Sequence, residues 1–312
     1  MTAAGAPYCQ DIATTCPRPS TAWLHTDDGI RLRTAIWSGG HRGTVVLFNG
    51  RTEYIEKYAF LAEPFMLAGF TLVMHDWRGH GLSDRLHRNP DLCHIESFAD
   101  YQIDVAAVLA ELKRMAAPQP YHIIAHSMGG CIALRTLHHI HPFQSAIFLA
   151  PMWGFCLNPI IGSLAVSLSA LAGLTGYGGT FVPGTNRENY VLSNQVDRNA
   201  LTSCSTMFHE IRQQILTHPE LSLGGPSYAW LRAALQETAD LRRRKPPAVP
   251  ALAFLGAEER VVDPDAIHSL MAAWSTGTLH TLPNCRHELL MEGADVRQGL
   301  LARMLDFLQE QG

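Results

Sequence analysis

Short apolar runs alternate with longer amphipathic stretches along most of this chain. Five mainly apolar runs have the length of strands buried on both faces, at residues 44–48, 71–75, 121–125, 145–150 and 251–255. The stretches that show helical periodicity or follow these runs lie at residues 56–68, 98–115, 128–139, 264–274 and 288–309. This alternation predicts an α/β fold, with a mainly parallel sheet covered by helices on both faces.

The N-terminal part has a different pattern. Residues 21–26 and 30–37 alternate between apolar and polar positions, and they flank Asp27-Asp28-Gly29, a sequence typical of a tight hairpin turn. We therefore expect two antiparallel strands before the first buried one.

The alternation of strands and helices stops between residues 152 and 245. Helical pieces at 200–216 and 228–241 occur there without a buried-strand run, and the segment closes with Arg-Arg-Arg-Lys-Pro-Pro at 242–247. We predict an α/β core at 1–151 and 246–312, with a helical cap at 152–245 inserted after the sixth strand.

One stretch that overlaps this cap has the apolarity of a membrane span. Residues 142–186 contain no Asp, Glu, Lys or Arg, and 159–175 are mostly apolar. The stretch is rich in Gly and Ser, begins with a proline and lacks basic flanks close by. It is therefore interpreted as a lipid-facing or buried helix.

Composition narrows the class of protein. Of the 312 residues, 47% are hydrophobic and 17% charged, which suits a globular core, and the net charge of −4 gives no reason to expect nucleic acid as a partner. The seven cysteines form no Cys-x-x-Cys pair, and the chain does not begin like a signal peptide. We expect a cytoplasmic protein without metal or cofactor. Peripheral contact with the inner membrane and the oligomeric state stay open.

The strongest chemical signal is Ser127. It stands between an apolar run ending at His126 and a helix-forming run starting at Met128, with Gly129 and Gly130 directly after it. Strand, serine and helix in this order are the sequence form of a nucleophile elbow, which presents a serine hydroxyl on a strained turn.

A serine nucleophile needs a base and an acid that orients the base, in the chain order Ser, acid, His. The predicted base is His287, in a loop before the last helix. Glu259 is favoured as the acid because it follows the 251–255 run in a short turn. Asp263 stays an alternative, although Pro264 after it also makes it a good helix N-cap.

The oxyanion hole needs backbone N–H donors. Met128 is predicted to supply one, and Arg51, after Gly50 at the end of the 44–48 run, the other. The Gly-rich loop at 76–83 is interpreted as structural, with Asp76 and Arg78 paired to each other.

Six segments together resemble the bacterial lysophospholipase L2 family of the α/β-hydrolase superfamily, which is similar to monoacylglycerol lipases. They are residues 49–58, 76–83, 125–130, 224–230, 258–263 and 286–288. The resemblance implies an α/β-hydrolase fold, a lipid-like ester substrate, Ser127 as nucleophile, His287 as base and Glu259 at the usual acid position. The chain departs from the general elbow pattern at Ala125, where glycine is commonest.

The predicted function is hydrolysis of the carboxylic ester of a lysophospholipid or monoacylglycerol through an acyl-enzyme. Met152, Trp153 and Phe155, at the start of the uncharged stretch, are expected to line an acyl pocket. The alternatives are a small-ester or thioester hydrolase, and a catalytically silent α/β-hydrolase that only binds a ligand.

Overall fold

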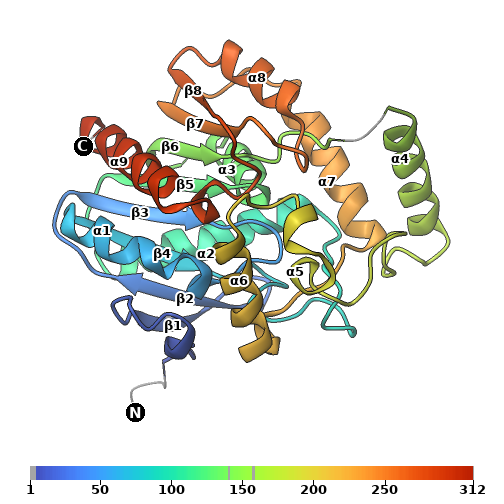
Figure 1. Ribbon diagram of the computed structural model, residues 1–312, viewed down its shortest axis with the longest axis horizontal. Coiled ribbons are helices and arrows are strands. Elements are labelled where there is room, and N and C mark those ends of the chain that lie inside the picture. Colours follow the sequence, from blue (N-terminus) through green and yellow to red (C-terminus); the bar gives the residue numbers. More distant parts are fainter. Residues whose placement is uncertain (1–4, 140, 157–158, 312) are drawn as a thin grey trace.

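A single mixed sheet forms the centre of the molecule (Figure 1). The computed structural model describes residues 5–139, 141–156 and 159–311, without the side chains of 159–166. The strands in these ranges are β1 Ser20–His25, β2 Arg31–Trp37, β3 Gly43–Phe48, β4 Phe70–His75, β5 Tyr121–His126, β6 Phe143–Leu149, β7 Ala251–Gly256 and β8 Gly277–Leu282. Their order across the sheet is β1-β2-β4-β3-β5-β6-β7-β8.

The pairing confirms the mainly parallel sheet. β1 pairs antiparallel with β2 and β2 with β4, and every later pair, from β4–β3 to β7–β8, is parallel. The strands β3, β4, β5 and β7 are buried along their whole length, which explains why they read as apolar runs rather than as alternating patterns.

Helices cover both faces, as predicted. On one face α2 Tyr101–Arg114, α3 Met128–Leu137 and α8 Pro264–Ala273 pack into one apolar cluster. On the other, α1 Ala62–Leu67 and α9 Ala294–Glu310 belong to a second cluster. Leu300, Met304 and Leu308 of α9 are fully buried, and their four-residue spacing puts them on one side of the helix.

Two predicted helices begin later than the sequence pattern suggested. The 288–309 stretch is broken into a 3₁₀ turn Leu289–Met291 and α9, and α6 Ser205–Thr217 starts well after residue 200. Glu292 is the reason for both. Its buried carboxylate accepts hydrogen bonds from the backbone N–H groups of Arg286 and Ser203 and from the Ser203 hydroxyl. These hydrogen bonds join the segment before α9 to the segment before α6 and hold both in a non-helical conformation.

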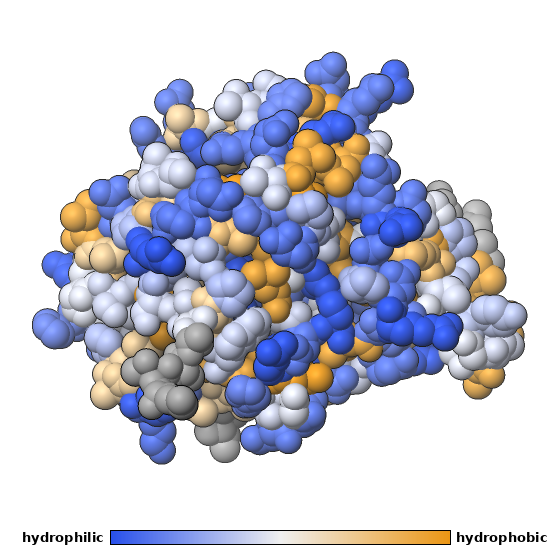
Figure 2. Space-filling view, turned by 90° about the horizontal axis from the view of Figure 1, so that it is seen from below, coloured by the Kyte–Doolittle hydropathy of each residue, from blue (hydrophilic) through white to orange (hydrophobic). Residues whose placement is uncertain are grey.

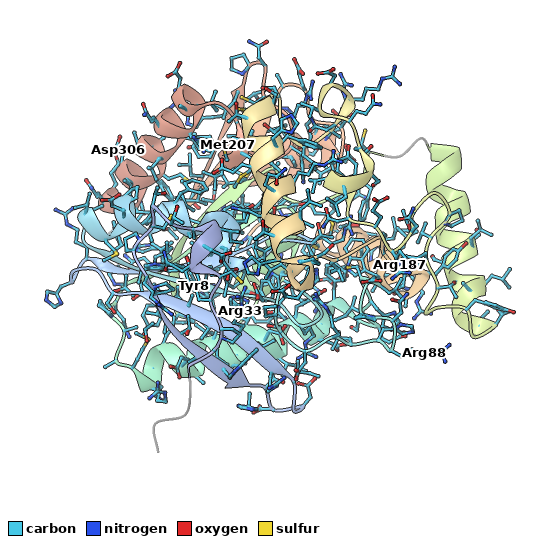
Figure 3. All side chains as sticks on the ribbon, turned by 60° about the horizontal axis from the view of Figure 1, so that its bottom comes forward. Tyr8, Arg33, Arg88, Arg187, Met207 and Asp306 are labelled. Atoms are coloured by element: carbon cyan, nitrogen blue, oxygen red, sulfur yellow. The ribbon has the colours of Figure 1, made fainter. Side chains whose placement is uncertain are left out.

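In its described part, the segment between β6 and β7 consists of helices joined by loops, with isolated bridges but no strand. It contains α4 Pro159–Leu174, α5 Tyr190–Ser193, α6 and α7 Tyr228–Leu241, and α6 lies beside α9 with Met207 between them (Figure 3). Helix α4 packs against α7 and projects from the edge of the molecule (Figure 1). The boundaries of the cap at 152 and 245 stay a prediction.

Helix α4 is only partly buried in the part whose side chains are described. Leu171 and Leu174 are exposed, whereas Ala172 is buried. Within the described ranges, no helix combines the length and apolarity needed to cross a bilayer. Apolar residues elsewhere on the face seen in Figure 2 form small patches separated by polar ones.

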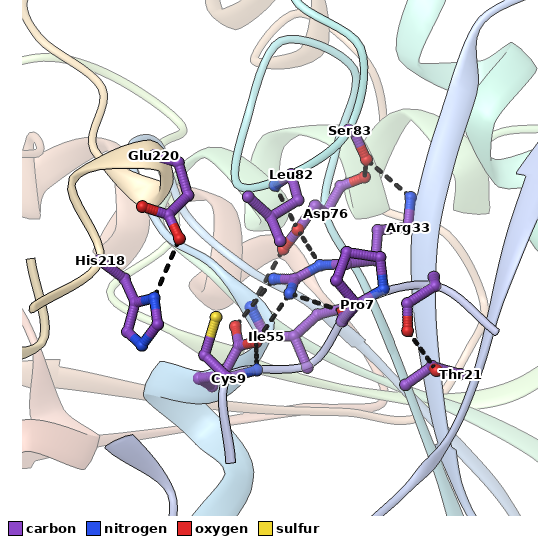
Figure 4. A network of polar contacts seen from close by, with 12 residues as sticks. Pro7, Cys9, Thr21, Arg33, Ile55, Asp76, Leu82, Ser83, His218 and Glu220 are labelled. Atoms are coloured by element: carbon purple, nitrogen blue, oxygen red, sulfur yellow. Dashed lines mark hydrogen bonds and ion pairs between the residues drawn. The ribbon is translucent and has the colours of Figure 1, made fainter. Parts of the chain in front are cut away.

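The predicted pairing of Asp76 with Arg78 is wrong. Asp76 follows β4 and pairs with Arg33 of the neighbouring β2, at 2.7 Å, while Arg33 also binds both carboxylate oxygens of Glu56 (Figure 4). Arg78 instead binds Asp28 and Asp104, each at 2.7 Å. The reason is sheet register: the Asp76 N–H bonds the Arg33 carbonyl, so the two side chains are cross-strand neighbours.

Candidate active site

Ser127 occupies a sharp turn between β5 and α3. Its φ of 49° and ψ of −117° are unfavourable for a residue with a side chain. The surrounding backbone holds it there: the Ser127 N–H donates to the Leu149 carbonyl at 3.1 Å, and the Ser127 carbonyl accepts from Gly130 at 2.8 Å and Met152 at 2.9 Å. Strain at this position presents the hydroxyl at the carboxyl end of the sheet, as the elbow pattern predicts.

The two glycines after Ser127 are required by close packing. A Cβ on Gly129 would overlap the Phe48 carbonyl at the end of β3, and one on Gly130 would lie 2.5 Å from the Cβ of Pro151. Ala125, which departs from the usual glycine, is completely buried and fits without exposing its methyl group. The helix can therefore approach the sheet closely enough to support the turn.

Ser127, His287 and Glu259 form one chain of hydrogen bonds. The Ser127 hydroxyl lies 2.9 Å from His287 Nε2, and His287 Nδ1 lies 2.8 Å from Glu259 Oε2. All three residues are buried although they come from three separate segments: the turn after β5, the loop after β8 and the loop after β7. With Nδ1 protonated, the free lone pair of Nε2 points at the serine proton, which is the arrangement a general base needs.

The second oxygen of Glu259 is fixed by its own loop. Glu259 Oε1 accepts hydrogen bonds from the backbone N–H groups of Val261, at 2.6 Å, and Val262, at 3.1 Å. Burial works against ionisation, but the nearby His287 and these N–H donors outweigh it and hold the pKa of Glu259 below its usual range. The carboxylate is therefore charged and oriented near neutral pH.

Asp263, the alternative acid, makes no contact with His287 in the described structure. Its Oδ1 accepts hydrogen bonds from the backbone N–H groups of Asp265 and Ala266, so Asp263 is the N-cap of α8. Its Oδ2 lies 3.7 Å from Arg242. Of the two candidate acids, only Glu259 is hydrogen-bonded to His287.

Two backbone N–H groups beside Ser127 fit an oxyanion hole. Neither the Met128 nor the Arg51 N–H donates a hydrogen bond within the described chain, whereas the neighbouring Gly50 N–H donates to the Glu53 carboxylate. A cavity of about 140 Å³ opens at Ser127 and His287, and Gly50 and Arg51 are on its wall. This space can hold the reacting carbonyl of a substrate.

A model of the family described as Serine aminopeptidase, S33 matches residues 39–294, which include Ser127, Glu259 and His287. The chain belongs to this family. S33 proteins are serine hydrolases, so the prediction of an enzyme of this class is confirmed.

Curated relatives of this S33 chain agree with the predicted resemblance. It is 28% identical over 273 residues to a probable lysophospholipase L2 of Haemophilus influenzae, covering 86% of this chain and 85% of the relative. It is 29% identical over 277 residues to lysophospholipase L2 of Escherichia coli, covering 86% and 80% of the two chains.

Solved structures share the fold at lower sequence identity. A soluble variant of monoglyceride lipase from Saccharomyces cerevisiae, in complex with a substrate analogue, is 20% identical and superposes with a TM-score of 0.74 over 98% of this chain and 99% of that one. A thermostable carboxyl esterase from Bacillus coagulans is 16% identical and gives 0.76 over 94% and 99%. The predicted α/β-hydrolase fold is confirmed.

A buried charged cluster beside the Ser127–His287–Glu259 site was not predicted from the sequence. Lys57 binds Glu53 at 2.9 Å and Glu288 at 2.8 Å, Tyr58 donates to Glu53, and His126 Nε2 lies 3.6 Å from the same carboxylate. Burial would raise the pKa of Glu53, but Lys57 and His126 lower it to about 2. The spacing of Glu53 and Lys57, four residues apart, was the only signal available in the sequence.

The carboxylates and the imidazole of this cluster are groups that could bind a metal ion, but the cluster already contains the ammonium of Lys57. Ligand atoms of Glu53, His126 and Glu288 lie within 4.8 Å of one another. The Lys57 ammonium binds both carboxylates, and they raise the pKa of Lys57 despite its burial. Lys57 therefore supplies the positive charge that these carboxylates need.

Met152, Trp153 and Phe155, which were predicted to line an acyl pocket, pack against other parts of the protein. Trp153 is fully buried, stacks on Trp274 and donates its indole N–H to the Gly130 carbonyl. Met152 is buried behind Ser127, and Phe155 packs edge-on against Trp230. The described wall of the Ser127 cavity includes none of these three; it combines the loop after β3, the Ser127 turn and the loop after β8 with Tyr190, Ala200, Leu201 and Val261.

Proposed function

We propose that this protein hydrolyses the carboxylic ester of a single-chain lipid, a lysophospholipid or a monoacylglycerol, through an acyl-enzyme. The observation that carries the chemistry is the continuous hydrogen-bonded chain from Ser127 through His287 to Glu259. The lipid substrate is supported by the lysophospholipase L2 relatives, which align with most of this chain.

Ser127 is the proposed nucleophile. Its Oγ attacks the ester carbonyl while His287 Nε2 takes the hydroxyl proton, and Glu259 stabilises the imidazolium that forms. The N–H groups of Arg51 and Met128 donate to the oxyanion. His287 then protonates the leaving alcohol, and a water activated by the same histidine releases the fatty acid.

Residues 152–245 are the proposed substrate-covering cap. Tyr190 and Leu201 of this segment lie on the wall of the Ser127 cavity, and Glu288 near the base donates its N–H to the Leu201 carbonyl. We place the protein in the cytoplasm, with the exposed Leu171 and Leu174 of α4 contacting the membrane that holds the lipid. Co-sedimentation with vesicles, compared between the wild type and Leu171→Ser/Leu174→Ser, tests that contact.

A small-ester or thioester hydrolase is the second candidate. The cavity at Ser127 is only about 140 Å³, which suits a short acyl group better than a long one.

A chain-length series tests both candidates. Purified protein is expected to react with a fluorophosphonate probe, and Ser127→Ala is expected to abolish labelling. The kcat/KM for esters is then measured from acetyl to palmitoyl chains, with lysophospholipids and monoacylglycerols included. A maximum at long chains supports the lipid substrate, whereas a maximum at acetyl or butyryl favours the small-ester hydrolase. A folded wild type that is not labelled contradicts the proposed mechanism.

A further inference from the structure

A second cavity adjoins the one that contains Ser127. Its volume is about 440 Å³, and it shares Arg51, Thr52 and Tyr190 with the Ser127 cavity. Gly224 and Gly225 also line it. The alcohol part of an ester bound at Ser127 would enter this second cavity if it extends past Arg51.

The side chain of Arg51 runs along the boundary of this cavity. Its Nη1 donates to the Gly224 carbonyl at 3.1 Å, and its guanidinium lies over the Trp230 ring with 5.7 Å to the centroid. Two segments that resemble the lysophospholipase L2 family, 49–58 and 224–230, therefore meet at this arginine. Neither contributes a member of the Ser127–His287–Glu259 chain.

Arg51 is only partly exposed and has no carboxylate within ion-pair distance among the described residues. The buried cations of the core differ, because Arg33, Lys57 and Arg78 each bind two carboxylates. A cation removed in part from water without a counter-charge favours the binding of an anion. Arginine is also well suited to phosphate, since its N–H groups match two phosphate oxygens.

Other groups on the wall are neutral hydrogen-bond donors. Within the described chain, the Thr52 hydroxyl and the Asn186 side-chain NH₂ donate no hydrogen bond, and both residues line the cavity. Glu188 is the one carboxylate on this wall, and it is exposed. The cavity wall thus offers one positive charge from Arg51, the donors of Thr52 and Asn186, and one exposed negative charge from Glu188.

We propose that this cavity binds the phosphate of a lysophospholipid head group, with Arg51 as the residue that recognises it. The inference rests on the proposed lipid-ester hydrolysis and names the preferred substrate class. Arg51 would act at two points of the substrate: its backbone N–H at the oxyanion of the acyl carbonyl, and its guanidinium at the phosphate of the leaving alcohol. An arginine side chain and a phosphoglycerol unit have similar lengths, so one residue spans that distance. A monoacylglycerol has no phosphate and leaves the guanidinium without a counter-charge.

The test compares two substrates with the same acyl chain, a lysophosphatidylethanolamine and a 1-monoacylglycerol. For Arg51→Met, the ratio of their kcat/KM values is expected to fall about 10-fold to 100-fold, as for loss of a charged hydrogen bond. Arg51→Lys keeps the charge and is expected to restore part of the ratio. Both substrates use the same oxyanion loop. An effect of these variants on that loop therefore changes both kcat/KM values by the same factor and leaves their ratio unchanged.

Arg187→Met is the matched control. Arg187 lies in the connection between α4 and α5, has a largely exposed side chain and pairs with Asp91 at 3.4 Å (Figure 3). Its removal takes away the same charge outside the cavity and is expected to leave the ratio unchanged. A ratio that is equal in the wild type and Arg51→Met, or that falls equally in Arg187→Met, overturns the phosphate site while lipid hydrolysis stands.

A binding measurement on the wild type is independent of lipid turnover. Glycerophosphoethanolamine is expected to slow the labelling of Ser127 by a fluorophosphonate, and glycerol at the same concentration is not. Protection by glycerophosphoethanolamine alone supports the head-group site, even if no lipid is hydrolysed and the proposed function fails. Equal protection by inorganic phosphate would indicate a free-anion site and overturn the head-group assignment, as would no protection by any of them.

Discussion

The carboxylate of Glu53 accepts a hydrogen bond from the backbone N–H of Gly50, which closes the loop after β3 on itself. Between them, Thr52 is held at a φ of 64°, a conformation that β-branched residues rarely adopt. Lys57 and Tyr58 bind the other oxygen of Glu53 and fix its position. The loop that presents the Arg51 N–H is therefore held in a strained but well-defined shape.

Glu53→Gln is expected to lower kcat about 10-fold to 100-fold with a smaller change in KM. A neutral amide binds the Gly50 N–H and Lys57 less strongly, and a looser loop orients the Arg51 N–H less well toward the oxyanion. Steady-state kinetics on one ester check this. Glu63→Gln, at an exposed position in α1, is the control and should behave as the wild type. An unchanged kcat in Glu53→Gln would show that the loop keeps its shape without this carboxylate.

Glu259→Gln and Asp263→Asn are expected to differ strongly. Loss of the Glu259 charge removes the group that orients His287, and we expect kcat to fall about 10³-fold to 10⁴-fold. Asparagine remains a good N-cap for α8, so Asp263→Asn should stay within a few-fold of the wild type. Kinetics of the two purified variants decide between them, and comparable losses would contradict the assignment of Glu259.

Gly129→Ala is expected to destabilise the protein severely, because the new methyl group would overlap the Phe48 carbonyl and that backbone cannot move freely. Gly299→Ala is the matched control in α9, where a Cβ meets nothing within 4 Å. It should raise the free energy of unfolding by about 0.5–1 kcal/mol, since alanine favours a helix. Urea unfolding of both variants measures this. A Gly129→Ala variant as stable as the wild type would mean that α3 can move away from β3.

His75 is expected to make the protein less stable in acid. Burial lowers its pKa from 6.5 to about 3, and neither ring nitrogen has a hydrogen-bond partner in the described structure. Between these values the unfolded chain binds a proton that the folded protein does not, so the free energy of unfolding falls as the pH falls from about 6.5 toward 3. Above pH 6.5 this effect is absent.

His75→Phe should reduce that pH dependence, because phenylalanine does not titrate. Urea unfolding at several pH values from 7 to 4 measures the slope for the wild type and the variant. His209→Phe, which replaces an exposed histidine of α6, should keep the wild-type slope. Equal slopes for the wild type and His75→Phe would mean that His75 gains a proton without unfolding.

Much of the fold could be predicted from the sequence because periodicity is a local property. The apolar runs correctly indicated β3 to β7, and the Ser127 segment indicated the strand-turn-helix unit. The sequence pattern gave a wrong prediction where two distant segments interact. Glu292 interrupts the predicted 288–309 helix by accepting a hydrogen bond from Ser203. Asp76 pairs with Arg33 across the sheet rather than with its neighbour Arg78.

The sequence by itself determined the order of the buried strands and of the main helices, the strained serine turn and the set of candidate side chains. Only the tertiary structure decided which of them meet. It brought Glu259 rather than Asp263 to His287, placed Trp153 in the core, and put the Arg51 guanidinium beside a second cavity without a carboxylate partner. Such contacts join residues far apart in the chain, and they depend on sheet register and loop packing, which no local pattern encodes.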